Sequence, residues 1–108
     1  MYFYTARLDL YHIIVHMISE RHVRLKINGR VQGVYFRKSA QSWAEQLNLR
    51  GIAENLSDGS LLIEVEGEPS KVKEFIERCE HGPRNAKVES VDIKELNIAA
   101  DFKGFSMG

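Results

Sequence analysis

The chain has 108 residues, with 15 basic and 15 acidic side chains and a formal net charge of zero at pH 7. This length predicts one domain, and the balanced charge excludes a global field that would attract nucleic acid or an anionic membrane. The single cysteine, Cys79, excludes an internal disulfide and a cysteine-based zinc cluster, and it is typical of the reducing cytoplasm, where we expect this protein.

Residues 1–20 form an extension that is apolar and aromatic but broken by charged residues and histidines. It is too interrupted to span a bilayer, and it lacks the basic start and the small-residue cleavage site of a secretory signal. We expect either an extra helix packed on the domain or a tail ahead of it. His12 and His16 have the i, i+4 spacing of helical metal ligands, but without a third ligand nearby no metal site is expected.

The first half of the domain, which starts at residue 21, predicts a strand, a helix and a second strand. Apolar and polar residues alternate over 21–28, which is typical of a half-buried strand. A glycine-containing segment follows, and a short strand is expected over roughly residues 50–56. Between them, helical spacing to about Asn48 places five residues on one face: Phe36, Ala40, Trp43, Ala44 and Leu47.

The second half predicts a hairpin, a helix and two further strands. The tetrad Ser57-Asp58-Gly59-Ser60 is a turn signal, and alternation from Leu61 predicts the returning strand. A second helix starts at residues 68–70 with Ser70 as its N-cap, and Gly82-Pro83 ends it. A strand with an irregularity near Ser90 comes next, and a short edge strand is expected within 102–107. The apolar stripe of the helix is Val72, Phe75, Ile76 and Cys79, which makes Cys79 an inert core thiol.

This order of elements predicts an α+β fold, the ferredoxin-like βαββαβ sandwich. We expect one mostly antiparallel sheet, two helices on one face, and a short extra C-terminal edge strand. In this topology the first two strands run parallel with the third between them, so their C-terminal ends share one edge of the sheet. The glycine segment and Asn55 are thereby brought to the same rim.

The segment NGRVQGVYFR, residues 28–37, predicts a phosphate site between a strand and a helix. Gly29 and Gly33 allow tight turns and close approach of backbone N–H groups to a ligand. A helix start adds unpaired N–H donors and a partial positive charge, which attract anions. Arg37 and Lys38 stand at this positive end, where a bound anion would favour them. The alternative is an ordinary strand–turn–helix connection with a solvated arginine.

Three blocks of the sequence resemble the acylphosphatase family. NGRVQGVYFR and ENLSDGSLLIEVEG are similar to its two conserved blocks, and Gly82-Pro83 followed by residues 86–88 matches in order and spacing. The resemblance covers about residues 22 to 107, and we expect residues 21–108 to be the acylphosphatase-like domain. It implies hydrolysis of acyl phosphates to carboxylate and inorganic phosphate without a metal or other cofactor. We expect a monomer that binds no nucleic acid and no membrane.

The same resemblance assigns roles to individual residues. Arg37 takes the role of the phosphate-binding arginine, and Asn55 orients the attacking water. Two alternatives share the fold: a non-catalytic module that binds phosphate or an acyl phosphate, and an RNA-binding domain, which the lack of aromatic residues on the central strands disfavours. The resemblance implies that phosphoryl oxygens are held by the backbone amides of Gln32, Gly33, Val34, Tyr35, Phe36 and Arg37.

Overall fold

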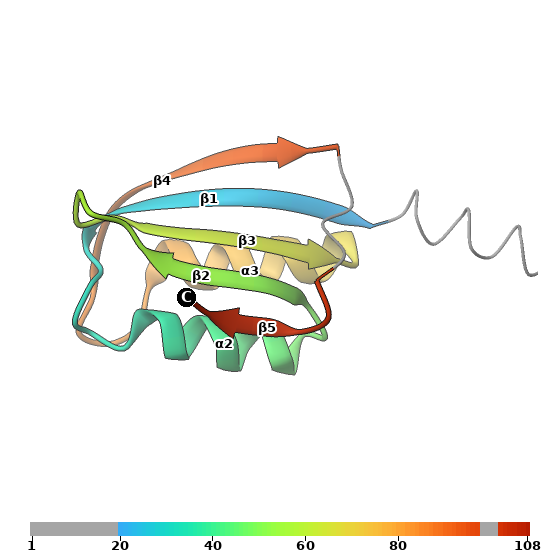
Figure 1. Ribbon diagram of the computed structural model, residues 1–108, viewed down its shortest axis with the longest axis horizontal. Coiled ribbons are helices and arrows are strands. Elements are labelled where there is room, and N and C mark those ends of the chain that lie inside the picture. Colours follow the sequence, from blue (N-terminus) through green and yellow to red (C-terminus); the bar gives the residue numbers. More distant parts are fainter. Residues whose placement is uncertain (1–19, 98–101) are drawn as a thin grey trace, which may run out of the picture.

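The computed structural model describes residues 20–97 and 102–108 of the chain (Figure 1). The expected extension over residues 1–20, with His12 and His16, lies outside the described residues except for Glu20. No helix in the described part is long and apolar enough to cross a membrane. The elements, in chain order, are β1 (Arg21–Arg30), α2 (Phe36–Gln46), β2 (Arg50–Asn55), β3 (Leu61–Gly67), α3 (Pro69–His81), β4 (Lys87–Leu96) and β5 (Phe105–Met107).

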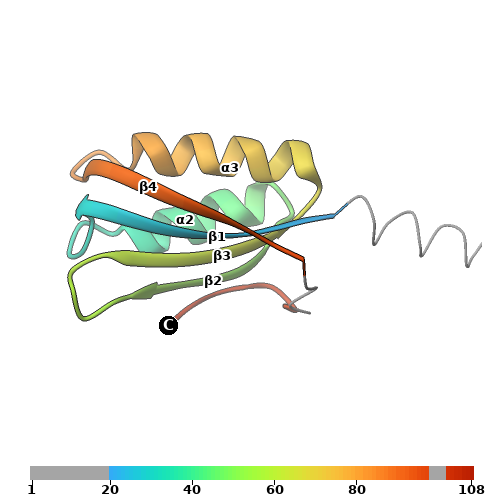
Figure 2. The ribbon, with the colours of Figure 1, turned by 90° about the horizontal axis from the view of Figure 1, so that it is seen from above.

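The five strands form one sheet in the order β4-β1-β3-β2-β5. Neighbouring strands are antiparallel except for β2 and β5, which are parallel. Both helices cover the same face of the sheet (Figure 2). The predicted ferredoxin-like sandwich is confirmed, and the C-terminal segment is the expected edge strand. Because β3 lies between β1 and β2 and opposes both, the C-terminal ends of β1 and β2 meet at one edge.

The core lies between the sheet and the two helices. The inward residues of β1 face those of β3 in register, for example Leu25 opposite Ile63, and both are fully buried. The predicted stripe of α3 is buried, including Cys79, and burial raises the pKa of the Cys79 thiol. A buried neutral thiol is a poor nucleophile, so the interpretation of Cys79 as an inert core residue is supported. Trp43 is half-buried and packs against the same core.

Two helix boundaries differ from the sequence prediction. Ser70 is not the N-cap of α3: the helix begins at Pro69, and Ser70 donates a hydrogen bond to the Glu68 carboxylate at 2.9 Å. Proline suits the first helical position because its fixed φ matches a helix and its missing N–H would be unpaired there. Helix α2 ends at Gln46, two residues before Asn48, which has a left-handed backbone (φ 56°). The N–H groups of Asn48 and Leu49 donate to the carbonyls of Glu45 and Ala44, respectively, and close the helix end.

The irregularity expected near Ser90 is a β-bulge opposite Gly29. Asn28 pairs with Ser90 and Gly29 with Val88, so Glu89 is the extra residue of β4. Gly29 has a φ of 128°, and a Cβ there would lie 2.1 Å from the Lys87 carbonyl oxygen. The bulge therefore requires glycine at the point where β1 leads into the loop.

Gly29→Ala is expected to lower the free energy of unfolding by at least ~2 kcal/mol, because both φ and the backbone contact oppose a Cβ. Urea denaturation measures this loss. Gly104→Ala is the matched control, since no atom would lie within 4 Å of its Cβ, and we expect a change of no more than about 0.5 kcal/mol. Equal urea midpoints for the two variants would contradict this account of the bulge.

Candidate functional site

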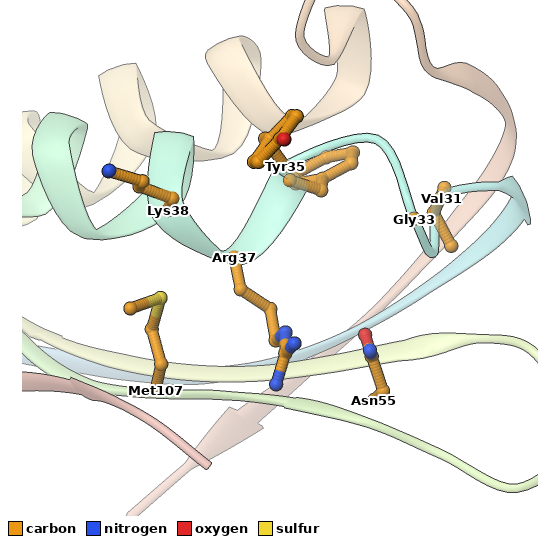
Figure 3. A pocket seen from close by; sticks show the side chains of 8 residues that line it. Val31, Gly33, Tyr35, Arg37, Lys38, Asn55 and Met107 are labelled. Atoms are coloured by element: carbon orange, nitrogen blue, oxygen red, sulfur yellow. The ribbon is translucent and has the colours of Figure 1, made fainter.

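An open pocket of about 450 Å³ lies where the ends of β1 and β2 meet the start of α2 (Figure 3). Its wall combines the loop after β1, the first turn of α2, the last residue of β2 and the end of β5. These segments are far apart in the sequence and adjoin only because of the sheet order. The lining residues are Val31, Gly33, Tyr35, Phe36, Arg37, Lys38, Asn55 and Met107.

The loop between β1 and α2 has two residues in the left-handed backbone conformation, Gly33 (φ 73°) and Tyr35 (φ 59°). Left-handed residues among right-handed ones turn successive N–H groups toward a common concavity, which is an anion-binding arrangement. Within the described residues, the backbone amides of residues 32–37 donate no turn or loop hydrogen bond to another backbone group. Helix α2, fully described, has no capping side chain and no acidic residue in its first turn. Its N-terminal N–H groups are therefore open to an anion.

Arg37 is the second residue of α2, and its side chain extends from the helix toward Asn55 (Figure 3). Its Nη1 donates a hydrogen bond to the backbone oxygen of Gly108 at 2.6 Å. Gly108 is itself held by its N–H, which donates to the Ala53 carbonyl of β2 at 2.8 Å. In the part of the chain that the structure describes, the Arg37 side chain makes this one hydrogen bond. Its other guanidinium N–H groups are therefore open to a ligand.

Asn55 is the last residue of β2, opposite Leu61 of β3. Its exposed amide points from the strand toward the loop and α2 (Figure 3). The structure therefore brings Arg37 and Asn55 to one pocket. Among the six residues whose amides were predicted to bind phosphate, Gly33, Tyr35, Phe36 and Arg37 line the pocket. Gln32 and Val34 do not line it.

Three pocket residues were not among the predicted site residues: Val31, Lys38 and Met107. Lys38 follows Arg37 in α2 and is exposed. Met107 reaches the wall because β5 pairs with β2, a long-range pairing for which the sequence carries no clear signal. Two cations line the pocket and, for the part of the chain that the structure describes, no carboxylate does. Its charge therefore favours an anionic ligand.

The described residues contain no group of three or more His, Cys, Asp and Glu side chains that could hold a metal ion. The hairpin next to the pocket instead contains an Asp58 carboxylate that accepts bonds from the Ser60 hydroxyl and N–H and pairs with Lys26 at 3.1 Å. The Ser60 bonds, followed by Lys26, hold the pKa of Asp58 well below its usual range. This carboxylate is thus engaged in the turn and does not line the pocket.

Comparison with known proteins relates most of the chain to one family. The family model described as Acylphosphatase matches residues 23–107. A curated acylphosphatase of Salinibacter ruber is 41% identical over 87 residues, covering 81% of this chain and 92% of the relative. The structure of an acylphosphatase from Coxiella burnetii superposes with a TM-score of 0.80 at 32% identity, over 84% of this chain and 95% of that one. Full-length HypF in its phosphate- and nucleotide-bound form matches with a TM-score of 0.76 at 31% identity, over 82% of this chain but 12% of HypF.

Proposed function

The chain belongs to the acylphosphatase family and is an enzyme that hydrolyses acyl phosphates. We propose that Arg37 and the loop amides hold the phosphate while Asn55 orients the attacking water. One observation supports this proposal above all. The pocket combines an uncapped helix start, a guanidinium at that start, and an amide that faces both from the next strand. Phosphate binding and water positioning are the two requirements of this hydrolysis.

The phosphoryl group fits the cationic end of the pocket. A guanidinium offers a planar fork to two phosphate oxygens and stays charged at every relevant pH. The amides of residues 32–37 add dipoles that are already oriented, so no reorganisation is needed as charge develops on the phosphoryl oxygens. The left-handed conformation of Tyr35, which costs a non-glycine residue of the order of 1–3 kcal/mol, is the kind of strain found at ligand sites.

Asn55 suits a reaction with a good leaving group. Water attacks phosphorus in line with the bond to the acyl oxygen, that bond breaks, and the carboxylate departs with the bonding electrons. The hydroxyl of the water stays on the phosphate, and its proton passes to solvent. An amide cannot deprotonate water, but it can hold the water in line, and alignment contributes more here than a strong base does.

Phosphate release from benzoyl phosphate, measured with a metal chelator present, tests the proposal. We expect saturable turnover with a kcat on the order of 10–10³ s⁻¹ that the chelator does not change. Competitive inhibition by inorganic phosphate is expected, because the product occupies the same amides and Arg37. Chelator-sensitive turnover would contradict the metal-independent mechanism. A folded protein that binds phosphate without turnover would support the non-catalytic module instead.

A further inference from the structure

The Gln32 side chain joins the loop of the pocket to the hairpin between β2 and β3. Its Nε2 donates to the Leu56 carbonyl at 2.8 Å and to the Ser60 carbonyl at 2.9 Å. Because both partners are carbonyl oxygens, only the NH₂ end of the amide can face them, so chemistry sets its orientation. Both donors of this group are thus used on the hairpin, which explains why the half-buried Gln32 does not line the pocket.

The hairpin that accepts these two bonds is already closed by its own hydrogen bonds. Leu56 N–H donates to the Ser60 carbonyl at 2.9 Å, and Gly59 N–H donates to the Leu56 carbonyl at 3.1 Å. Gln32 therefore supplies a second donor to each carbonyl, which matches the two lone pairs of a carbonyl oxygen. Asp58 closes the turn further through Ser60. The hairpin is thus a well-braced anchor for the Gln32 side chain.

The two hydrogen bonds of Gln32 connect the loop after β1 with the end of β2, and each end of this link is one residue away from a proposed site residue. Gln32 directly precedes Gly33 and the amides of the phosphate loop, and Leu56 directly follows Asn55. We infer that Gln32 is a positioning residue, whose side chain sets the distance between the phosphate-holding loop and the amide of Asn55. This inference rests on the proposed roles of that loop and of Asn55.

A positioning role separates catalysis from binding. A substitution of the Gln32 side chain leaves its backbone N–H, the other loop amides and Arg37 in place, so inorganic phosphate should still bind. In-line attack depends on the separation of water and phosphorus, and a misplacement of about 1 Å can cost roughly 10²-fold in rate. Loss of the link should therefore lower kcat far more than it weakens phosphate binding.

The decisive variants are Gln32→Met and Gln32→Glu. Methionine keeps the length of the side chain without its donors, and we expect kcat for benzoyl phosphate to fall about 10- to 100-fold. The inhibition constant of inorganic phosphate should change less than about threefold. In Gln32→Glu, an ionised carboxylate places oxygens against the two carbonyl oxygens and has no donor for them. Protonation of this carboxyl group restores one donor. The kcat of Gln32→Glu relative to wild type should therefore recover as pH falls from about 8 to about 5, whereas that of Gln32→Met should not.

Two further variants separate positioning from general support of the fold. Gln41→Met is the matched control, because Gln41 Nε2 donates to the Phe105 carbonyl at 3.0 Å, away from this link, and kcat should stay within about twofold of wild type. In Gln32→Met/Asn55→Ala, kcat should stay within about twofold of that of Asn55→Ala, because the positioned group is already absent.

Four results would overturn the inference. Equal losses of kcat and phosphate affinity in Gln32→Met, or multiplied losses in the double variant, would assign Gln32 a purely structural role. An unchanged kcat in both Gln32 variants would overturn the inference and leave the proposed function intact. A folded wild type without turnover would overturn the proposed function, and this inference with it.

Discussion

Replacing Arg37 with alanine is expected to lower kcat/KM for benzoyl phosphate by about 10³-fold or more. Removal of one donor to a developing anion typically costs about 10²–10³ in turnover, and here a full charge is lost as well. Arg37→Lys keeps the charge but loses the planar fork, so we expect a smaller loss, about 10²-fold. Steady-state kinetics at saturating and limiting substrate measures both effects.

Arg78→Ala is the matched control for Arg37. Arg78 bonds the side chains of Gln46 and Glu74 on the surface of the helices, and its loss should leave kcat/KM within about twofold of wild type. Thermal unfolding of each variant is needed too, because Arg37 also binds the backbone oxygen of Gly108. A folded Arg37→Ala protein within about tenfold of wild-type activity would remove Arg37 from the proposed mechanism.

Asn55→Ala is expected to lower kcat about 10²- to 10³-fold while KM changes little. The reason is that the amide acts on water, and the phosphate remains held by the loop and Arg37. Asn55→Asp keeps the shape but adds a negative charge that faces the phosphate, so it should weaken binding of inorganic phosphate as well. Kinetics with benzoyl phosphate and inhibition by inorganic phosphate separate the two effects.

Asn28→Ala serves as the control for Asn55. Asn28 Nδ2 donates to the Ser90 hydroxyl at 3.1 Å, outside the pocket lining, so its kcat should stay within about twofold of wild type. If Asn55→Ala raised KM in proportion to any loss of kcat/KM and left kcat unchanged, Asn55 would be a binding residue. The water-orienting role would then be wrong.

The fold was predictable because its signals are local. The alternation that includes Leu25 and the apolar stripe that includes Phe75 each specify an element and its buried face, and both are buried as expected. The order of these elements leaves few topologies, since connections are short and the parallel crossover has one favoured hand. The prediction of Ser70 as the N-cap was wrong because two local signals compete at that helix start, and Pro69 as the first helical residue places the cap two residues earlier, at Glu68.

The candidate site was predictable in part. Arg37 and Asn55 belong to sequence blocks that resemble a family. The predicted parallel direction of β1 and β2, with β3 between them, was enough to place these residues at one edge of the sheet. Tyr35 was expected to contribute an amide, but its left-handed backbone was not expected, since local preference favours glycine there. The loop is held at its ends by β1 and α2, and such constraints can impose a left-handed conformation on a non-glycine residue. Local sequence does not reveal these constraints.

The elements and the α+β topology came from the sequence alone, because periodicity and turn residues are properties of the chain. The two residues proposed for the chemistry also came from the sequence, through the resemblance of its motifs to a known family. The tertiary structure alone decided which distant groups meet. Gln32 reaches the carbonyls of Leu56 and Ser60, and Gly108 reaches Arg37, through strand register and hairpin geometry. Hydrogen bonds form over about 3 Å, whereas sequence patterns place elements far more coarsely. A contact between residues 24 or 71 positions apart therefore depends on the packed fold.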